Sequence, residues 1–169
     1  EELSPVLKRV FPPGSESMQQ LAYTPSRALR DPEVIQPTQM PTFAVFSLHD
    51  DNIGVIPQLT TSALSKILQR MVETGWSGFT TRYWQIGDHD PCIAYLSKAS
   101  WDPATEPEEV YRDQVGAVMG EEAVVSMLDA FAELEALTVA LEDHAMGLAF
   151  PVPGMGTKHF SASPLPKSQ

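Results

Sequence analysis

Cysteine is nearly absent from this chain, and its scarcity restricts both covalent structure and chemistry. Cys92 is the single cysteine among 169 residues, so no disulfide forms within the chain and no cysteine-based metal cluster can be built. It follows a proline and precedes an apolar segment, which favours buried packing over the role of a nucleophile. A chain without internal disulfides is typical of a reducing compartment.

Basic residues and long apolar runs are also scarce. The chain has 11 lysines and arginines against 22 aspartates and glutamates, a net charge of −11. This balance argues against binding to a phosphate backbone, which requires a surplus of cations, so we expect no nucleic-acid partner. No apolar run approaches membrane-spanning length, and residues 1–5 lack the basic and apolar parts of a signal peptide. We therefore expect no membrane partner.

Several motifs with a known mechanism are missing. The sequence contains no Gly-x-Ser-x-Gly, no His-x-His and no His-Glu-x-x-His. The turn Gly154–Gly156 is too short to indicate a phosphate-binding loop. These absences exclude no whole class of enzyme, but they give no reason to expect a cofactor.

Proline, in contrast, is abundant and unevenly placed. Eleven of the 15 prolines lie between Pro5 and Pro41 or between Pro151 and Pro166. We expect an extended connector over residues 1–41, with a short helix near Ser17–Tyr23, and an extended tail over residues 149–169. Extended ends of this kind are typical of a piece of a larger enzyme, in which they act as connectors.

The middle of the chain predicts a strand, a helix and a second strand within residues 42–90. Residues 42–48 are mostly apolar β-formers, and residues 78–84 form a second strand candidate. Between them, a helix capped by Thr60, Thr61 or Ser62 and ended by Gly75 has one apolar stripe. The stripe consists of Leu64, Ile67, Leu68, Met71 and Val72.

Residues 91–148 read as helical. One helix is expected over Cys92–Ser100, and a capping-box pattern at Thr105–Glu108 predicts another that ends near Met119. A long helix follows from about Glu121 to His144. Its expected apolar stripe consists of Val124, Met127, Leu128, Phe131, Leu134, Leu137 and Leu141.

Two polar clusters follow the predicted strands, where parallel α/β folds carry their chemistry. They consist of His49, Asp50 and Asp51 after the first strand and of Asp88, His89 and Asp90 after the second. A pair of carboxylates, one protonated and one ionised, is what glycoside cleavage requires, so the four aspartates are the candidate catalytic residues. Two other roles remain open for them: the aspartates cap helices and turns, or they bind a metal together with the histidines.

Substrate binding is assigned to four further side chains. Arg82 and Trp84 share one face of the second strand by alternation, and an aromatic ring there can support a sugar. His49 and His89 complete the candidate substrate-binding set. The competing interpretation is that the aromatic residues only pack in a core. Trp101 is expected to have a structural role.

The segment Thr42–Trp84 resembles the last barrel strands of large α-glucuronidase-like glycoside hydrolases. The resemblance is carried by His49-Asp50-Asp51 and by Gly75-Trp76-Ser77-Gly78 leading to Arg82-Tyr83-Trp84. It continues in the Trp101-Asp102-Pro103 turn and the Glu108–Asp113 segment. It implies a partial (β/α)8 barrel, containing the last strands, followed by an α-helical region. It also implies a carbohydrate substrate and a larger chain that completes the barrel, because the general acid of this family matches no residue here.

Three classes of function follow from these observations. The first is a fragment or small subunit of a glycoside hydrolase that uses carboxylates at the barrel mouth together with a larger chain. The second is a non-catalytic interaction subunit in which the aspartates only cap turns. The third is a small metal-dependent hydrolase, which would lose activity in the presence of a chelator.

Overall fold

A computed structural model of the chain describes residues 3–21, 24–48, 58–82 and 90–143. Helix α1 (Leu3–Val10) is followed by strand β1 (Ser17–Gln20), helix α2 (Pro25–Ala28) and the 3-10 turn η1 (Pro32–Val34). The βαβ unit comprises β2 (Thr42–Ser47), α3 (Thr61–Thr74) and β3 (Gly78–Arg82). The helical region comprises α4 (Asp90–Ala99), α5 (Pro107–Met119), the 3-10 turn η3 (Glu121–Ala123) and α6 (Val124–Asp143).

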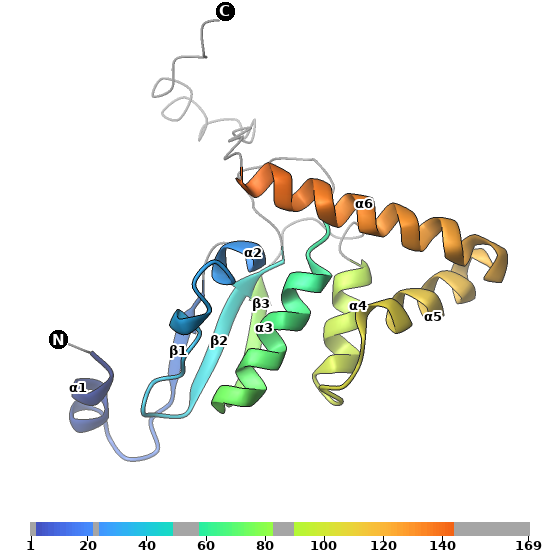
Figure 1. The fold of residues 1–169 in the computed structure, drawn as a ribbon. Coiled ribbons are helices and arrows are strands. Elements are labelled where there is room, and N and C mark those ends of the chain that lie inside the picture. The colour runs from blue at the N-terminus through green and yellow to red at the C-terminus, as the bar shows by residue number, and fades with distance from the viewer. Residues whose placement is uncertain (1–2, 22–23, 49–57, 83–89, 144–169) are drawn as a thin grey trace, which may run out of the picture.

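The described residues form one parallel sheet of three strands in the order β1-β2-β3 (Figure 1). β2 is the central strand and pairs with both neighbours, Ser17 lying opposite Thr42 and Phe43 opposite Gly78. The sheet is open, with β1 and β3 as its edges. The expected partial (β/α)8 barrel is therefore wrong. A strand-helix-strand pattern is common to barrels and open sheets, and it does not determine whether the sheet closes.

β1 lies in a segment for which the sequence predicts a connector and a short helix. Ser17–Gln20 is instead a strand, so the helix expected near Ser17–Tyr23 is wrong. Hydroxyl groups fix the register at its start, since Ser17 Oγ lies 2.8 Å from both Thr38 Oγ1 and Thr42 Oγ1. The N-terminal segment therefore belongs to the sheet and does more than connect.

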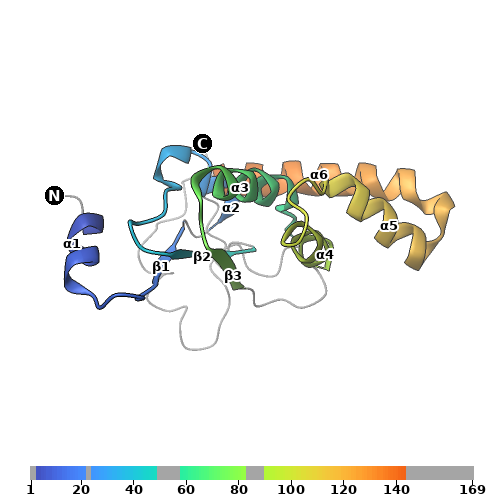
Figure 2. The ribbon, with the colours of Figure 1, turned by 90° about the horizontal axis from the view of Figure 1, so that it is seen from below.

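One face of the sheet carries the core. Figure 2 shows the strands in a row with α2, α3 and α6 on the same side. Ala44, Phe46 and Leu48 of the β2 segment point to that side and are at most 1% exposed. The α3 side chains that pack toward them repeat every three or four residues, as the stripe predicts. They are Leu64, Ile67, Leu68 and Met71.

Two details of α3 differ from the expected helix. Val72, which the sequence includes in the buried stripe, is 61% exposed. Thr60 occupies the N-cap position, but its hydroxyl donates a hydrogen bond of 2.8 Å to the Leu48 carbonyl instead of capping the helix. This hydrogen bond joins the start of α3 to the end of the β2 segment.

Gly75 ends α3 in a left-handed conformation, with φ of 78°. The N–H groups of Gly75 and Trp76 both donate to the Met71 carbonyl. We expect Gly75→Ala to lower the free energy of unfolding by about 1–2 kcal/mol, because a Cβ disfavours this backbone conformation even though nothing lies within 4 Å of it. Urea denaturation followed by circular dichroism measures the change. A stability equal to that of the parent chain would contradict it.

Candidate functional site

The two strands that precede the predicted polar clusters in the sequence end at the carboxyl edge of the sheet. β2 and β3 are parallel neighbours, and Ser47 lies opposite Arg82 in the last pair of the register. The Leu48 N–H donates to the Arg82 carbonyl at 3.1 Å, so the two strands remain paired to their ends. The two strands are therefore neighbours in the sheet.

Most of the predicted site residues lie outside the described residues. These are His49, Asp50, Asp51, Trp84, Asp88 and His89. Arg82 ends β3 and is partly buried. Alternation places it on the sheet face opposite Phe79, whose ring stacks on Phe46 at 5.3 Å in the core. Asp90 is the first residue of α4.

Behind this edge, a chain of buried hydroxyl and thiol groups joins the starts of α3 and α4. Thr61 Oγ1 lies 3.2 Å from Cys92 Sγ, and Thr60 Oγ1 lies 3.9 Å from the same sulfur. Cys92 is fully buried, which confirms the packing role expected from its sequence context. The sulfur thus links the two helices that follow β2 and β3.

Helix α6 lies across the start of α3 (Figure 1) and is held there by two polar side chains. Glu135 Oε1 accepts hydrogen bonds from the Ser62 N–H at 3.2 Å and from the Tyr111 hydroxyl at 3.0 Å. Thr138 Oγ1 accepts from the Leu59 N–H at 3.0 Å and is itself 1% exposed. A carboxylate at a helix N-terminus is favourable because it satisfies free N–H groups and meets the positive end of the helix dipole.

Burial determines the protonation of the thiol and the two phenols in this region. It raises the pKa of Cys92 above its usual value of 9.0, and hydrogen bonds from Thr61 and Thr60 offset only part of the effect. Burial likewise raises the pKa of Tyr95 and of Tyr111. All three groups are therefore neutral at pH 7. This network stabilises the fold, and a neutral buried thiol has no nucleophilic role.

The same shifts predict a loss of stability in alkali. The folded chain disfavours ionisation of Cys92, Tyr95 and Tyr111, so unfolding releases protons once the pH exceeds the ordinary values of 9.0 and 10.0. The contribution of Cys92 is complete below pH 9.0, and those of Tyr95 and Tyr111 are complete below pH 10.0. Above its own value, each group lowers the stability by about 1.4 kcal/mol per pH unit. Urea midpoints between neutral pH and about pH 10.5 measure how the free energy of unfolding depends on pH. In the Cys92→Ser variant this dependence should be weaker, because the contribution of the thiol is lost. A midpoint that does not change with pH would contradict it.

A small cavity lies beside the start of α3, next to the carboxyl edge. It has a volume of about 310 Å³ and lies between α2, α3 and α6. Hydroxyl groups and two cations line part of it together with the Glu135 carboxylate, and the hydroxyls and cations can hold a hydroxyl-rich or anionic group. They belong to Ser26, Arg30, Thr60, Ser62 and Lys66. The sequence indicated none of them as a binding residue, because they come from two separate segments and form no motif.

A metal centre finds no support in the described ranges, where no three histidine, cysteine, aspartate or glutamate side chains gather closely enough to hold an ion. Of the candidate metal ligands, Asp90 lies inside those ranges, and the other aspartates and the histidines of the two clusters lie outside them. Trp101, expected to be structural, is 91% exposed and packs against nothing in the core.

No family model, curated protein or solved structure matches this chain.

Proposed function

We propose that this chain contributes part of the active site of a carbohydrate-active hydrolase that cleaves glycosidic bonds and acts together with a larger chain. The candidate carboxylates remain Asp50, Asp51, Asp88 and Asp90. Their site is the carboxyl edge of an open parallel sheet. One carboxyl group protonates the leaving oxygen, and a second acts as base or nucleophile.

One observation carries the proposal: the strands that lead into the two acidic clusters are adjacent, parallel and paired to their last residues. Ser47 lies opposite Arg82, so the segments that begin at residues 49 and 83 start side by side. In open α/β sheets, ligands bind outside the carboxyl ends of the strands. This arrangement supports convergence of carboxylates from both segments.

The cavity beside α3 supports a sugar-sized ligand. Its volume of about 310 Å³ lies at the lower end of the range for small-molecule sites. Arg30 and Lys66 are among its lining residues, and both can bind the carboxylate of a uronic acid.

The sheet face opposite the core supports the proposal that the chain acts together with a larger one. β2 is apolar on both faces, and Phe43 and Val45 on the second face are only partly buried. Met18 of β1, on the same face, is 69% exposed, and none of the described helices lies there (Figure 2). Parallel sheets are normally covered on both faces, so a partner that supplies a second layer fits this fold.

The experiment that tests the proposal is an assay of sugar release by the full chain, in the complex isolated from its source. Oligosaccharides that carry a uronic acid are the first substrates, and neutral oligosaccharides are the comparison. We expect hydrolysis that a chelator does not abolish. A complex that cleaves neither substrate class would contradict the proposal and favour a non-catalytic interaction subunit.

A further inference from the structure

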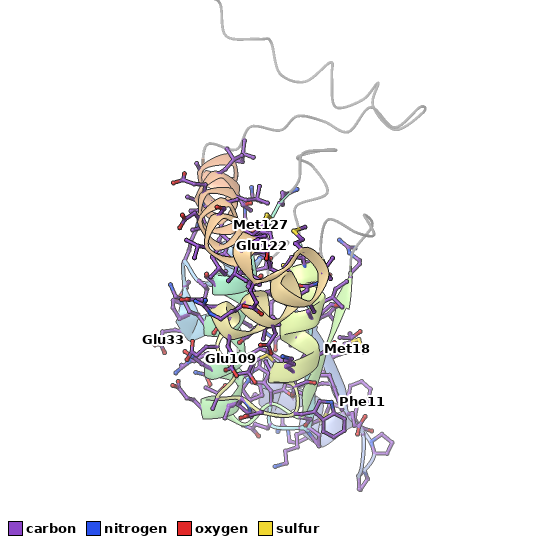
Figure 3. All side chains as sticks on the ribbon, turned by 90° about the vertical axis from the view of Figure 1, so that its right-hand side faces the viewer. Phe11, Met18, Glu33, Glu109, Glu122 and Met127 are labelled. Carbon is purple, nitrogen blue, oxygen red and sulfur yellow. The ribbon has the colours of Figure 1, made fainter. Side chains whose placement is uncertain are left out.

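The hairpin formed by α5 and α6, residues 106–143, carries almost all of the chain's net charge. It contains eleven aspartates and glutamates and a single basic residue, Arg112, which gives −10 of the total −11. Arg112 is already paired with Glu108 at 2.9 Å. Figure 3 looks onto this side of the molecule, with Glu109 and Glu122 belonging to the hairpin. The rest of the chain is close to neutral.

This acidic hairpin also exposes large apolar side chains. They are Val118 (75% exposed), Met119 (53%), Val125 (67%), Leu137 (47%) and Val139 (45%). Helix α6 is apolar over most of its circumference, and a helix of that kind is normally covered by other protein. No described helix is long and apolar enough to cross a membrane, α6 included.

A groove runs between α3, α5 and α6 along this surface. Its volume is about 980 Å³, and its floor includes Tyr111, Leu128 and Phe131. The rings of Tyr111 and Phe131 lie 4.9 Å apart at an interplanar angle of 60°, a tilted aromatic contact that favours their packing. Val125 and Val139 also line the groove, and both are largely exposed. Apolar side chains therefore form the base of the groove and parts of its rim.

Charge at the groove is predominantly negative. Glu106, Asp129 and Glu135 line it together with the Glu108–Arg112 ion pair, and Lys66 is the other cation in the lining. A second copy of this chain would bring an equally acidic hairpin to the same surface, which like-charge repulsion disfavours. A cationic partner would instead gain both apolar burial and charge complementarity.

We propose that this groove is a docking site for an amphipathic helix of a partner polypeptide, with apolar residues on one face and lysine or arginine along its flanks. The groove is lined along α6 from Val125 to Val139, about 21 Å, which accommodates about four turns of a partner helix. Apolar side chains enter the groove and the cationic flanks meet Glu106 and Asp129. The inference is independent of catalysis, because it requires none of the carboxylates at the sheet edge.

The test uses two synthetic helical peptides of about 18 residues, five turns each. Both have leucine along one face, and their flanks carry lysine in one and glutamate in the other. Fluorescence anisotropy measures binding to the full chain at about 0.15 M salt, where long-range attraction is screened. We expect saturable binding of the lysine peptide and none of the glutamate peptide.

Two double variants with the same change in charge separate docking in the groove from general attraction. The pair Val125→Lys and Asp129→Lys alters the groove, and the pair Val118→Lys and Glu133→Lys alters the same hairpin outside it. All four side chains are exposed, so circular dichroism and urea midpoints should match the parent chain. We expect the groove pair to weaken binding by about tenfold or more and the control pair by less than about threefold.

Three results would overturn this inference. Equal weakening by both pairs would indicate non-specific electrostatic attraction. Absence of saturable binding would indicate that the groove does not accept a cationic amphipathic helix. This outcome includes the case in which another part of the chain fills the groove. A dimer of the chain, seen by sedimentation and abolished only by the groove pair, would assign the groove to a second copy. None of these results depends on hydrolysis, so they leave the proposed activity to its own assay.

Discussion

Asp88→Asn and Asp50→Asn are each expected to lower the rate of glycoside hydrolysis by about 10² to 10⁴, the range that a positioned general acid or base contributes. Asparagine keeps the size of the side chain and removes its ability to take up or release a proton. The two aspartates follow β3 and β2, strands that are paired at Ser47 and Arg82. Loss of either carboxylate should therefore disable the same site. Initial rates on the substrate identified by the sugar-release assay measure the effect.

Asp31→Asn is the matched control, because Asp31 is exposed, precedes η1 and forms no capping hydrogen bond with its side chain. We expect its rate to equal that of the parent chain. Native mass spectrometry must show that all three variants still assemble with the larger chain. If Asp50→Asn and Asp88→Asn both retain the parent rate in intact complexes, the aspartates only cap turns and the catalytic interpretation is wrong.

Phe46→Ala is expected to lower the free energy of unfolding by about 3–5 kcal/mol, as truncation of a buried aromatic residue usually does. Phe46 lies on the central strand, is 1% exposed and stacks on Phe79 at 5.3 Å. Its removal leaves a cavity between the sheet and α3 that neither layer can close without moving. Since a domain has about 5–15 kcal/mol of stability in total, this single change removes a large part of it. Urea denaturation followed by circular dichroism gives the difference.

Phe11→Ala is the control for this measurement, because Phe11 is 50% exposed and follows α1 at the edge of the structure. We expect a change of less than about 0.5 kcal/mol. Similar losses in the two variants would contradict the burial of Phe46 and the place of β2 at the centre of the core.

The βαβ unit was predictable from sequence because its pattern is local. The three-four spacing of Leu64, Ile67, Leu68 and Met71 and the glycine at 75 define α3, and the observed helix follows both signals. β1 was not predictable in the same way. Its sequence, Ser-Met-Gln-Gln, has little apolar character, and it is a strand because it pairs with β2. The barrel was inferred from a resemblance together with a pattern that open sheets share, and neither specifies whether the sheet closes.

Exposure was harder to predict than helix position. Val72 and Leu137 fit the apolar stripes of their helices, yet they are 61% and 47% exposed. Periodicity indicates which side chains share a face, but it does not show how wide a face the neighbouring element covers. The cavity beside α3 shows the same limit, since Ser26 and Arg30 reach it from a segment more than thirty residues away from Lys66. Only the packing of α2 and α6 on α3 brings these groups together.

The association of this chain with a larger one is tested most directly by native mass spectrometry of the protein purified from its source without denaturation. We expect a stable complex in which the chain is bound to a partner of greater mass, and the sugar-release assay should then be positive for that complex. A homogeneous species at the chain's own mass of 18.5 kDa that unfolds cooperatively would contradict this account.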